Sequence, residues 1–339
     1  MYLKELSELS GISGDEGEVR DFIKSHMASY ADEMWVDNVG NLLILKKGRE
    51  SDKKVLIAAH MDEVGMMVVR INEDGTLGVA PVGGLDMRVC LGKRVRIGDV
   101  HGVIGYKAIH LQKKMEDKFP AWRDVKVFCG FKNKDEAAEN VKLGDYVYFT
   151  TTFEEKGEYF SGKAFDDRGG CSILMDLLSS GEPAYDTIFA FLVQEETGLR
   201  GSSVVVEQVK PDVAIVVETT TAGDVPELEE YKWATHLGDG PAVTFAHRGY
   251  VVDPRVFQTI VETAEKAGIR YQYKRRTAGG TDAFRFARSA YGVPAGVVSI
   301  PCRYIHSPVS LMRKDDYHET LKLMQLLVMK GEVKKAWRN

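Results

Sequence analysis

The stretch Val55-Leu56-Ile57-Ala58-Ala59-His60-Met61-Asp62 carries the strongest indication of the fold. Its first five residues form an unbroken apolar run, which is typical of a strand buried on both faces of a sheet. The run ends at His60 and Asp62, two polar residues placed where the strand would leave the core. In open α/β sheets the carboxyl ends of the strands form the functional edge. The stretch therefore predicts an α/β protein with a functional site beside residue 60.

Outward from this strand, the same pattern recurs in the second half of the chain, where apolar runs alternate with amphipathic segments. This rhythm is typical of strands and helices that follow one another in an α/β domain. The predicted strands lie at 188–193, 213–217 and 293–300, and the predicted helices at 170–178 and 317–329.

Between about residue 65 and residue 159 the chain shows short alternating runs broken by glycine. This spacing is typical of a small antiparallel β-barrel or sandwich rather than a parallel sheet. A charged stretch at 113–118 interrupts the runs and is expected to form an exposed loop. We therefore expect an α/β domain in two parts, 1–65 and 160–339, interrupted by an inserted β domain at 66–159.

Two further helices are predicted from the residues at their starts. Ser13 and Glu16 have the spacing of a capping box and precede an apolar stripe. Asp253 and Pro254 supply an N-cap and a proline at the first helical position.

The composition excludes several classes of protein. The chain of 339 residues has a net charge of -5, which argues against nucleic acid as a partner, because phosphate binding requires a concentrated basic surface. Its four cysteines are scattered without a Cys-x-x-Cys pair, so neither a disulfide framework nor a thiolate zinc site is expected. No apolar run approaches the roughly 20 residues that span a bilayer, and the first residues lack a signal-peptide core. We expect a soluble, cytoplasmic protein with no membrane or nucleic-acid partner.

Residues of metal-ligand type follow the predicted strands or precede a helix. The groups are His60 with Asp62, Glu195 with Glu196, Glu218, His306, and Asp166 with Asp167. Each group alone is common without a metal, and Asp-Asp before a helix is usual at an N-cap. Their joint presence favours a divalent cation such as zinc, cobalt or manganese. Two such ions need about five ligands with one carboxylate shared, and a further free carboxylate could activate the bridging water.

Six motifs along the chain carry a family resemblance. They are AHMDEVG at 59–65, AFDDR at 164–168, QEETG at 194–198, AGDVP at 222–226, GGTDA at 279–283 and YIHSP at 304–308. In this order they resemble the motifs of the tetrahedral (TET) aminopeptidase family, the glutamyl and deblocking aminopeptidases among the co-catalytic metallopeptidases. GVIGYK at 102–107 also looks like the family. The resemblance covers essentially the whole chain and implies a three-layer α/β/α zinc-peptidase-like domain with an inserted small β-barrel.

The resemblance also implies a role for each site residue. The implied metal ligands are His60 and Glu218 for one ion, Glu196 and His306 for the other, and Asp166 as the bridge between them. Glu195 would be the general base and acid, and Asp62 would orient His60 through its second ring nitrogen. Asp167 is expected to fix backbone geometry rather than bind metal. Glu218 departs from the family pattern, which more often has aspartate there, and we expect metal binding to survive with altered affinity.

The expected substrate contacts are less fully specified. The candidate substrate-binding residues are Gly280, Thr281, Asp282 and His236. The preferred N-terminal side chain stays open, because Arg200, Lys232, Arg303 and His236 could form a pocket for acidic residues, and acidic groups elsewhere could do the same for basic ones.

These residues imply an aminopeptidase that uses two zinc or cobalt ions to remove N-terminal residues from short peptides. The nearest alternative is a di-metal carboxypeptidase or amidohydrolase of the same clan, but those enzymes insert their second domain later in the chain. Here the insertion falls between His60 and Asp166. A non-catalytic scaffold is disfavoured because every ligand type and Glu195 are present. A glycosidase needs only a carboxylate pair and would leave both histidines unexplained.

The inserted β domain carries an expectation about assembly. The resemblance implies that it pairs two chains and that six dimers form a hollow tetrahedral dodecamer. An insertion joined at both ends is rigid enough to present edge strands and loops to a symmetry mate. Enclosed sites would admit unfolded peptides and exclude folded proteins.

Overall fold

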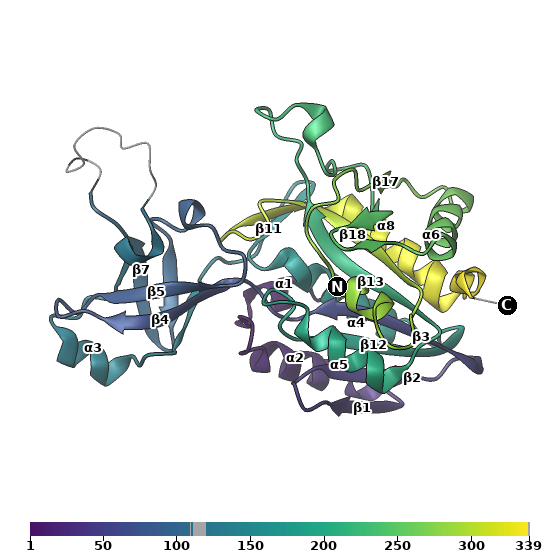
Figure 1. The fold of residues 1–339 in the computed structure, drawn as a ribbon, viewed down its shortest axis with the longest axis horizontal. Helices are drawn as coiled ribbons and strands as arrows, with labels where there is room; N and C mark the ends of the chain where they lie inside the picture. The colour runs from purple at the N-terminus through teal and green to yellow at the C-terminus, as the bar shows by residue number, and fades with distance from the viewer. Residues whose placement is uncertain (109, 111–119, 338–339) are drawn as a thin grey trace.

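The computed structural model describes residues 1–108, 110 and 120–337. Figure 1 shows a small β-barrel to one side of a larger α/β unit. The loop expected at 113–118 lies outside the described residues. Among the described residues, no helix combines the length and the apolar composition that crossing a bilayer requires.

A mixed sheet forms the centre of the larger unit, in the order β1-β2-β12-β3-β13-β18-β19-β11-β10. The four central strands β12, β3, β13 and β18 run parallel to one another. They pair antiparallel with the strands that flank them, β2 and β19. The strands are β1 (Glu33–Val36), β2 (Leu42–Lys46), β3 (Glu50–His60), β10 (Glu154–Lys156), β11 (Tyr159–Gly162), β12 (Tyr185–Leu192), β13 (Val213–Thr221), β18 (Ala295–Arg303) and β19 (Ser310–Arg313), with β14 (Ala242–Val243) on β18 and β17 (Gln272–Tyr273) on β14.

Helices cover both faces of this sheet. Successive residues of β3 point to opposite faces, so Ile57 packs in one apolar cluster and Leu56 in another. One cluster includes residues of α1 (Leu3–Glu8), α2 (Gly17–Met27), α4 (Phe165–Ser179), α6 (Pro254–Lys266) and α8 (Lys314–Met324); the other includes residues of α5 (Arg200–Val209) and α7 (Ala283–Ala287). The predicted three-layer α/β/α arrangement is therefore confirmed.

The two predicted helix starts have different outcomes. At α6, Asp253 accepts a hydrogen bond from the Arg255 N–H, and Pro254 is the first helical residue, as predicted. The predicted capping box is wrong, because α2 begins at Gly17 and Ser13 caps nothing. The Ser13 and Glu16 side chains form hydrogen bonds outside the helix instead.

The inserted region forms a closed barrel of short antiparallel strands in the order β4-β5-β8-β7-β6-β9. Its core is apolar and includes Met66, Leu77 and Val127. Its strands are β4 (Gly65–Ile71), β5 (Leu77–Val82), β6 (Arg94–Ile97), β7 (Val100–Gly105), β8 (Lys126–Phe128) and β9 (Tyr146–Phe149), with helix α3 (Lys134–Asn140) beside them. The predicted small β-barrel is confirmed. After it, β10 and β11 join the large sheet, and the segment boundaries at 65/66 and 159/160 stay a prediction.

Short elements complete the described chain. They are the 3-10 helices Ala28–Tyr30, Met87–Val89, Trp122–Asp124, Glu230–Lys232 and Glu332–Ala336, the π-helical turn Gln325–Met329 that continues α8, and the two-stranded pair β15 (Ala246–His247) and β16 (Tyr250–Val251).

Candidate active site

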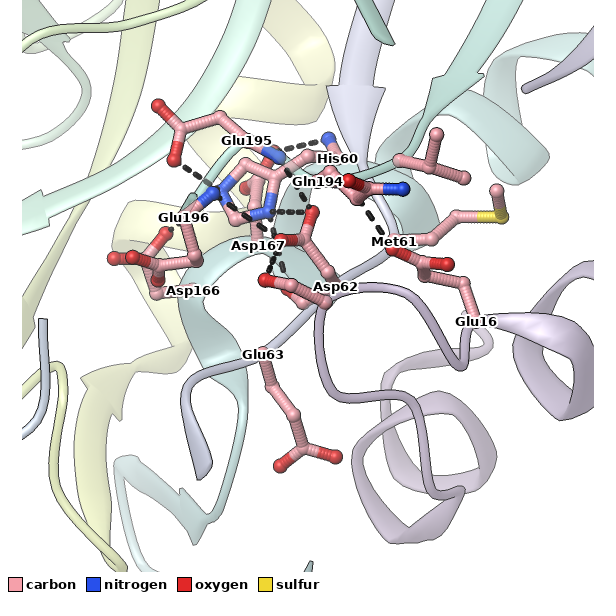
Figure 2. A network of polar contacts seen from close by, with 12 residues as sticks. Glu16, His60, Met61, Asp62, Glu63, Asp166, Asp167, Gln194, Glu195 and Glu196 are labelled. Atoms are coloured by element: carbon pink, nitrogen blue, oxygen red, sulfur yellow. Dashed lines mark hydrogen bonds and ion pairs between the residues drawn. The ribbon is translucent and has the colours of Figure 1, made fainter. Parts of the chain in front are cut away.

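The carboxyl ends of the central parallel strands bring the expected ligands together. Figure 2 shows His60, Asp166 and Glu196 of this cluster, with Glu195 beside them. The contributing positions are His60 at the end of β3, Glu195 and Glu196 after β12, Glu218 within β13, His306 after β18, and Asp166 at the start of α4. The sequence placed Glu218 at the end of its strand, whereas β13 continues to Thr221. The convergence itself follows from parallel strands that end at a common edge.

The Asp166 carboxylate divides this cluster into two halves. Its Oδ1 lies 3.3 Å from His60 Nε2, which lies 3.4 Å from Glu218 Oε1. Its Oδ2 lies 3.4 Å from His306 Nε2, which lies 3.1 Å from Glu196 Oε1. We call His60 and Glu218 with Asp166 Oδ1 the inner half-site, and His306 and Glu196 with Asp166 Oδ2 the outer half-site.

The donor set fits divalent metal ions. Imidazole nitrogens and carboxylate oxygens are ligands of zinc and related cations. Four atoms arranged tetrahedrally at about 2.0–2.1 Å from an ion lie roughly 3.3–3.4 Å apart, which is close to the nitrogen–oxygen distances within each half-site. One carboxylate oxygen toward each histidine is the arrangement that a bridging ligand between two ions requires.

Asp167 also lies within reach of a metal held by His60 and Glu218. However, its Oδ2 accepts a hydrogen bond from the His60 N–H at 3.3 Å, and its Oδ1 accepts one from the Gly170 N–H at 3.1 Å. Burial, followed by the charge of Glu218, raises the pKa of Asp167 well above its usual range. These bonds favour a part in fixing the backbone over one as a ligand.

Asp62 links His60 to the two glutamates. Its Oδ1 accepts the Glu195 N–H at 3.0 Å, and its Oδ2 accepts the Glu196 N–H at 3.1 Å and the Ser13 hydroxyl at 2.5 Å. The His60 Nδ1 lies 3.0 Å from the Asp62 carbonyl oxygen and 3.4 Å from its Oδ1. Burial opposes the charge of this carboxylate, but its hydrogen bonds, with those to His60 foremost, hold the pKa of Asp62 below its ordinary value.

Glu195 faces the cluster without belonging to either close half-site. Its Oε2 lies 4.0 Å from His60 Nε2, and among the described residues no hydrogen bond reaches its side chain. Burial raises the pKa of Glu195 well above its ordinary value, and the charges of Asp282, Glu218 and Glu196 add to this effect. A positive charge near this carboxylate would favour its ionised form.

The backbone around the site is strained at several positions. Gln194, Tyr304 and His306 have φ values of 54°, 62° and 56°, in the left-handed region that residues other than glycine seldom occupy. Gln194 directly precedes Glu195, and Tyr304 belongs to the turn that carries His306. Such strain persists where the surrounding contacts determine the geometry, and it gathers at functional sites.

A cavity of about 820 Å³ opens beside the cluster. Besides the site carboxylates, its lining includes Gly280 and Thr281, two of the expected substrate-binding residues. It also includes three basic residues that sequence reasoning missed, Arg248, Lys274 and Arg276. The run Lys274-Arg275-Arg276 just before the GGTDA motif was the available signal, because it places basic side chains next to a motif of the site.

The other expected substrate residues lie elsewhere. Asp282 is fully buried next to Thr281 and is absent from the residues that line the cavity. His236 lines a neighbouring cavity of about 920 Å³, with its Nε2 3.7 Å from Asp224. Among the described lining residues of the cavity beside the cluster there is no Arg200, Lys232 or Arg303. The Arg303 guanidinium instead pairs with Asp224 at 2.8 Å.

Residues 40–323 of the chain match the family described as M42 glutamyl aminopeptidase. The chain belongs to the M42 peptidase family. This M42 peptidase is therefore an aminopeptidase, and the resemblance to the TET aminopeptidases is confirmed. Family membership also decides against the carboxypeptidase, scaffold and glycosidase alternatives.

Solved structures described as peptidases agree with this assignment, and a further structure described as an endoglucanase shares the fold. An aminopeptidase from the archaeon Desulfurococcus kamchatkensis is 35% identical to the M42 peptidase, with a TM-score of 0.93 over 98% of this chain and 95% of that one. A Thermotoga maritima structure described as an endoglucanase is 53% identical, with a TM-score of 0.83 over 98% of both chains. The TET1 peptidase of Pyrococcus horikoshii, which can assemble into a tetrahedron or a large octahedral shell, is 30% identical, with a TM-score of 0.85 over 96% of this chain and 97% of that one.

Proposed function

We propose that this M42 peptidase holds two divalent ions, zinc or cobalt, and removes N-terminal residues from short peptides with Glu195 as the general base. The observation that carries the proposal is the Asp166 carboxylate, which directs one oxygen toward each of the two histidines. His60 and Glu218 would hold the inner ion, and Glu196 and His306 the outer ion, with Asp166 shared.

The chain's own residues then supply the remaining steps. Two bound ions would lower the pKa of a shared water and polarise the scissile carbonyl group. Glu195 accepts the proton of the attacking water and returns it to the leaving amine. Asp62 keeps Glu195 in place by accepting its backbone N–H, and it orients His60 through the second ring nitrogen.

Glu195→Gln tests this assignment. The variant keeps the shape of the side chain but cannot take up a proton, so hydrolysis should fall by about 10²–10⁴-fold while both ions stay bound. Kinetics of the metal-loaded variant and elemental analysis measure the two quantities. Glu139→Gln, at an exposed position of α3, is the matched control. Near-normal turnover of metal-loaded Glu195→Gln would refute the role.

We also propose that the enzyme prefers acidic N-terminal side chains. Lys274 is only 9% exposed and lines the cavity, and among the described residues its ammonium group makes no hydrogen bond or ion pair. Burial lowers the pKa of Lys274, and the opposing charges of Glu218 and Asp166 would be committed to the ions. A substrate carboxylate would therefore be the natural partner of Lys274, with Arg248 and Arg276 nearby. The description of the family as glutamyl aminopeptidases supports this preference.

A panel of aminoacyl-coumarin substrates tests the preference. We expect glutamyl and aspartyl substrates to react faster than leucyl or lysyl ones, and Lys274→Gln to reduce the glutamyl-to-leucyl ratio of kcat/KM by about 10–100-fold, as expected for a lost charged hydrogen bond. Lys142→Gln on the exposed surface of the insertion is the control. A preference for lysyl or leucyl substrates would contradict the proposal without touching the role of Glu195.

Finally, we propose a cytoplasmic homo-oligomer in which the insertion at 66–159 pairs two chains and six dimers form a tetrahedral dodecamer. The tetrahedral assembly of the Pyrococcus horikoshii TET1 peptidase supports this proposal. Enclosed active sites would restrict substrates to unfolded peptides. Light scattering under native conditions should give roughly twelve subunits, and a fully active monomer would contradict the assembly.

A further inference from the structure

The loop at residues 10–16 lies between the β-barrel and the turn that carries Glu195. It precedes α2, in the segment where the sequence predicted a helix cap. The side chains of Ser13 and Glu16 point instead toward the active site, whereas the Ser13 carbonyl oxygen and the Asp15 carboxylate accept hydrogen bonds from the barrel. None of these residues binds a metal ion in the proposed mechanism, so their arrangement calls for a separate explanation.

Glu16 holds the start of the Glu195 turn. Its side chain is buried, at 4% exposure, and its Oε1 accepts the N–H of Gly14 at 2.8 Å and the N–H of Gln194 at 3.1 Å (Figure 2). Gln194 is the left-handed residue directly before Glu195. A hydrogen bond to its N–H therefore stabilises a strained conformation that sets the direction of the following glutamates.

Ser13 acts on the same turn by a second route. Its hydroxyl donates to Asp62 Oδ2 at 2.5 Å, and the two oxygens of Asp62 accept the N–H groups of Glu195 and Glu196. Ser13 and Glu16 thus hold the turn at three successive N–H groups, those of residues 194, 195 and 196. A buried network with every member hydrogen-bonded is rigid.

The barrel anchors the other side of the loop. The Tyr146 hydroxyl donates to the Ser13 carbonyl oxygen at 3.3 Å, and the Tyr148 hydroxyl donates to the Asp15 carboxylate. Both tyrosines belong to β9. Gly14 has a φ of 93° and passes so close to the Tyr146 hydroxyl that a Cβ there would lie 2.8 Å from it. The loop is therefore fixed between the two parts of the molecule.

We propose that Ser13 and Glu16 are positioning residues that fix the carboxylate of the general base relative to the metal cluster. This inference rests on the proposed function, because it presumes that Glu195 takes the proton of the attacking water. Neither side chain touches the substrate cavity, so their loss acts on the chemical step and leaves substrate binding unchanged.

Glu16→Ala and Glu16→Gln form the decisive pair. Glutamine keeps an oxygen that can accept the Gly14 and Gln194 N–H groups, whereas alanine removes it. Because a misplacement of about 1 Å can cost about 10²-fold in rate, we expect Glu16→Ala to lower kcat by about 10–100-fold with KM within about twofold. Glu16→Gln should restore kcat to within about threefold of the wild type. Asp21→Ala, which removes an exposed carboxylate of α2, is the control.

Bound metal and the melting temperature are measured in every variant, and Ser13→Ala supplies a second route should Glu16→Ala not fold. We expect Ser13→Ala to lower kcat by a smaller factor with two ions still bound. Wild-type kcat in Glu16→Ala would overturn the inference, and so would equal losses in Glu16→Gln and Glu16→Ala. If Glu16→Ala does not fold, wild-type kcat in Ser13→Ala would overturn it instead. Normal activity of Glu195→Gln would instead refute the proposed function itself, so the two failures are distinguishable.

Discussion

The inner and outer half-sites contain the same types of ligand but are supported differently. His60 is 2% exposed and ends a central strand, and its second ring nitrogen is held by Asp62. The His306 side chain is 35% exposed and lies in the turn after β18. Its second ring nitrogen lies 3.1 Å from the carbonyl oxygen of Gly84, in the inserted region.

If each half-site holds an ion as proposed, the inner ion would depend on the sheet core and the outer ion on a contact between separate parts of the chain. A ligand on a packed strand is fixed by many neighbours, whereas a ligand on a turn is fixed by a few hydrogen bonds. The partners that hold a histidine's second nitrogen also tune its affinity for metal. We therefore expect the inner ion to be held more tightly than the outer one.

Alanine variants of the two histidines should separate the half-sites by the largest effect. His306→Ala should retain about one ion per chain, because the inner ligands are fixed by the sheet core. His60→Ala should lose both, because His306 lies on a turn and the shared carboxylate of Asp166 would no longer be held by an inner ion. Activity should fall by more than about 100-fold in both variants, since loss of a histidine's supporting partner alone costs about 10–100-fold. Elemental analysis after gel filtration and peptide hydrolysis measure these outcomes.

His101→Ala, an exposed histidine of the barrel, controls for the loss of a histidine as such and should keep both ions. Equal metal loss in His60→Ala and His306→Ala would show that the two half-sites act as one unit, and the proposed difference would then disappear.

The ligand cluster was predictable because it depends on residue type and strand order. Each apolar run that forms a central strand is followed by, or contains, a ligand-type side chain, as at His60 and Glu218. Parallel strands bring those ends to one edge without further information. The short glycine-broken runs of the insertion predicted a barrel for a similar reason, since alternation of period two is a local signal.

The supporting contacts were not predictable because they join segments that are distant in sequence. Ser13 and Glu16 match a capping box, yet their side chains bond Asp62 and Gln194, where buried N–H and carboxylate groups need partners. Lys274 enters the cavity only because β17 pairs with β14, and His236 faces a different cavity although it lies in a nearby loop. Local patterns do not contain such tertiary choices.

Gly84→Ala should weaken the outer ion selectively. A Cβ at Gly84 would lie 2.9 Å from His306 Nδ1, too close for the ring to keep its place. We expect the affinity for the second ion to fall by about 10–100-fold, in the range seen when the support of a metal-binding histidine is lost. Titration of the metal-free variant with zinc measures both affinities. The inner ion serves as the internal control, and weakening of both ions would mean that the insertion supports the whole site.

The dependence of metal binding on pH gives the smallest expected difference between the inner and outer half-sites. In the metal-free protein, burial opposes the charge on His306, but its bonds to Asp166 and Glu196 raise the pKa of that imidazole to about 11. Burial likewise opposes the charge on His60, but the neighbouring Glu218 and Asp166 raise the pKa of this imidazole well above its ordinary value. A ligating imidazole nitrogen must be free of its proton, so each ion displaces one and apparent affinity should rise with pH.

The same shift fixes the sign of the stability change. Because the folded pKa of His306 lies above its unfolded value, the stabilisation by the protonated ring is complete below about pH 6.5 and is lost as pH rises toward about 11. The melting temperature of the metal-free protein should therefore fall over this range, and His306→Gln should remove part of the slope. High salt should reduce the contribution of His306 to the stability of the metal-free protein more than that of His60. The reason is that solvent screens the ion pairs of the more exposed His306 side chain. An equal salt effect on both histidines would show that the outer half-site is as well shielded from water as the inner one.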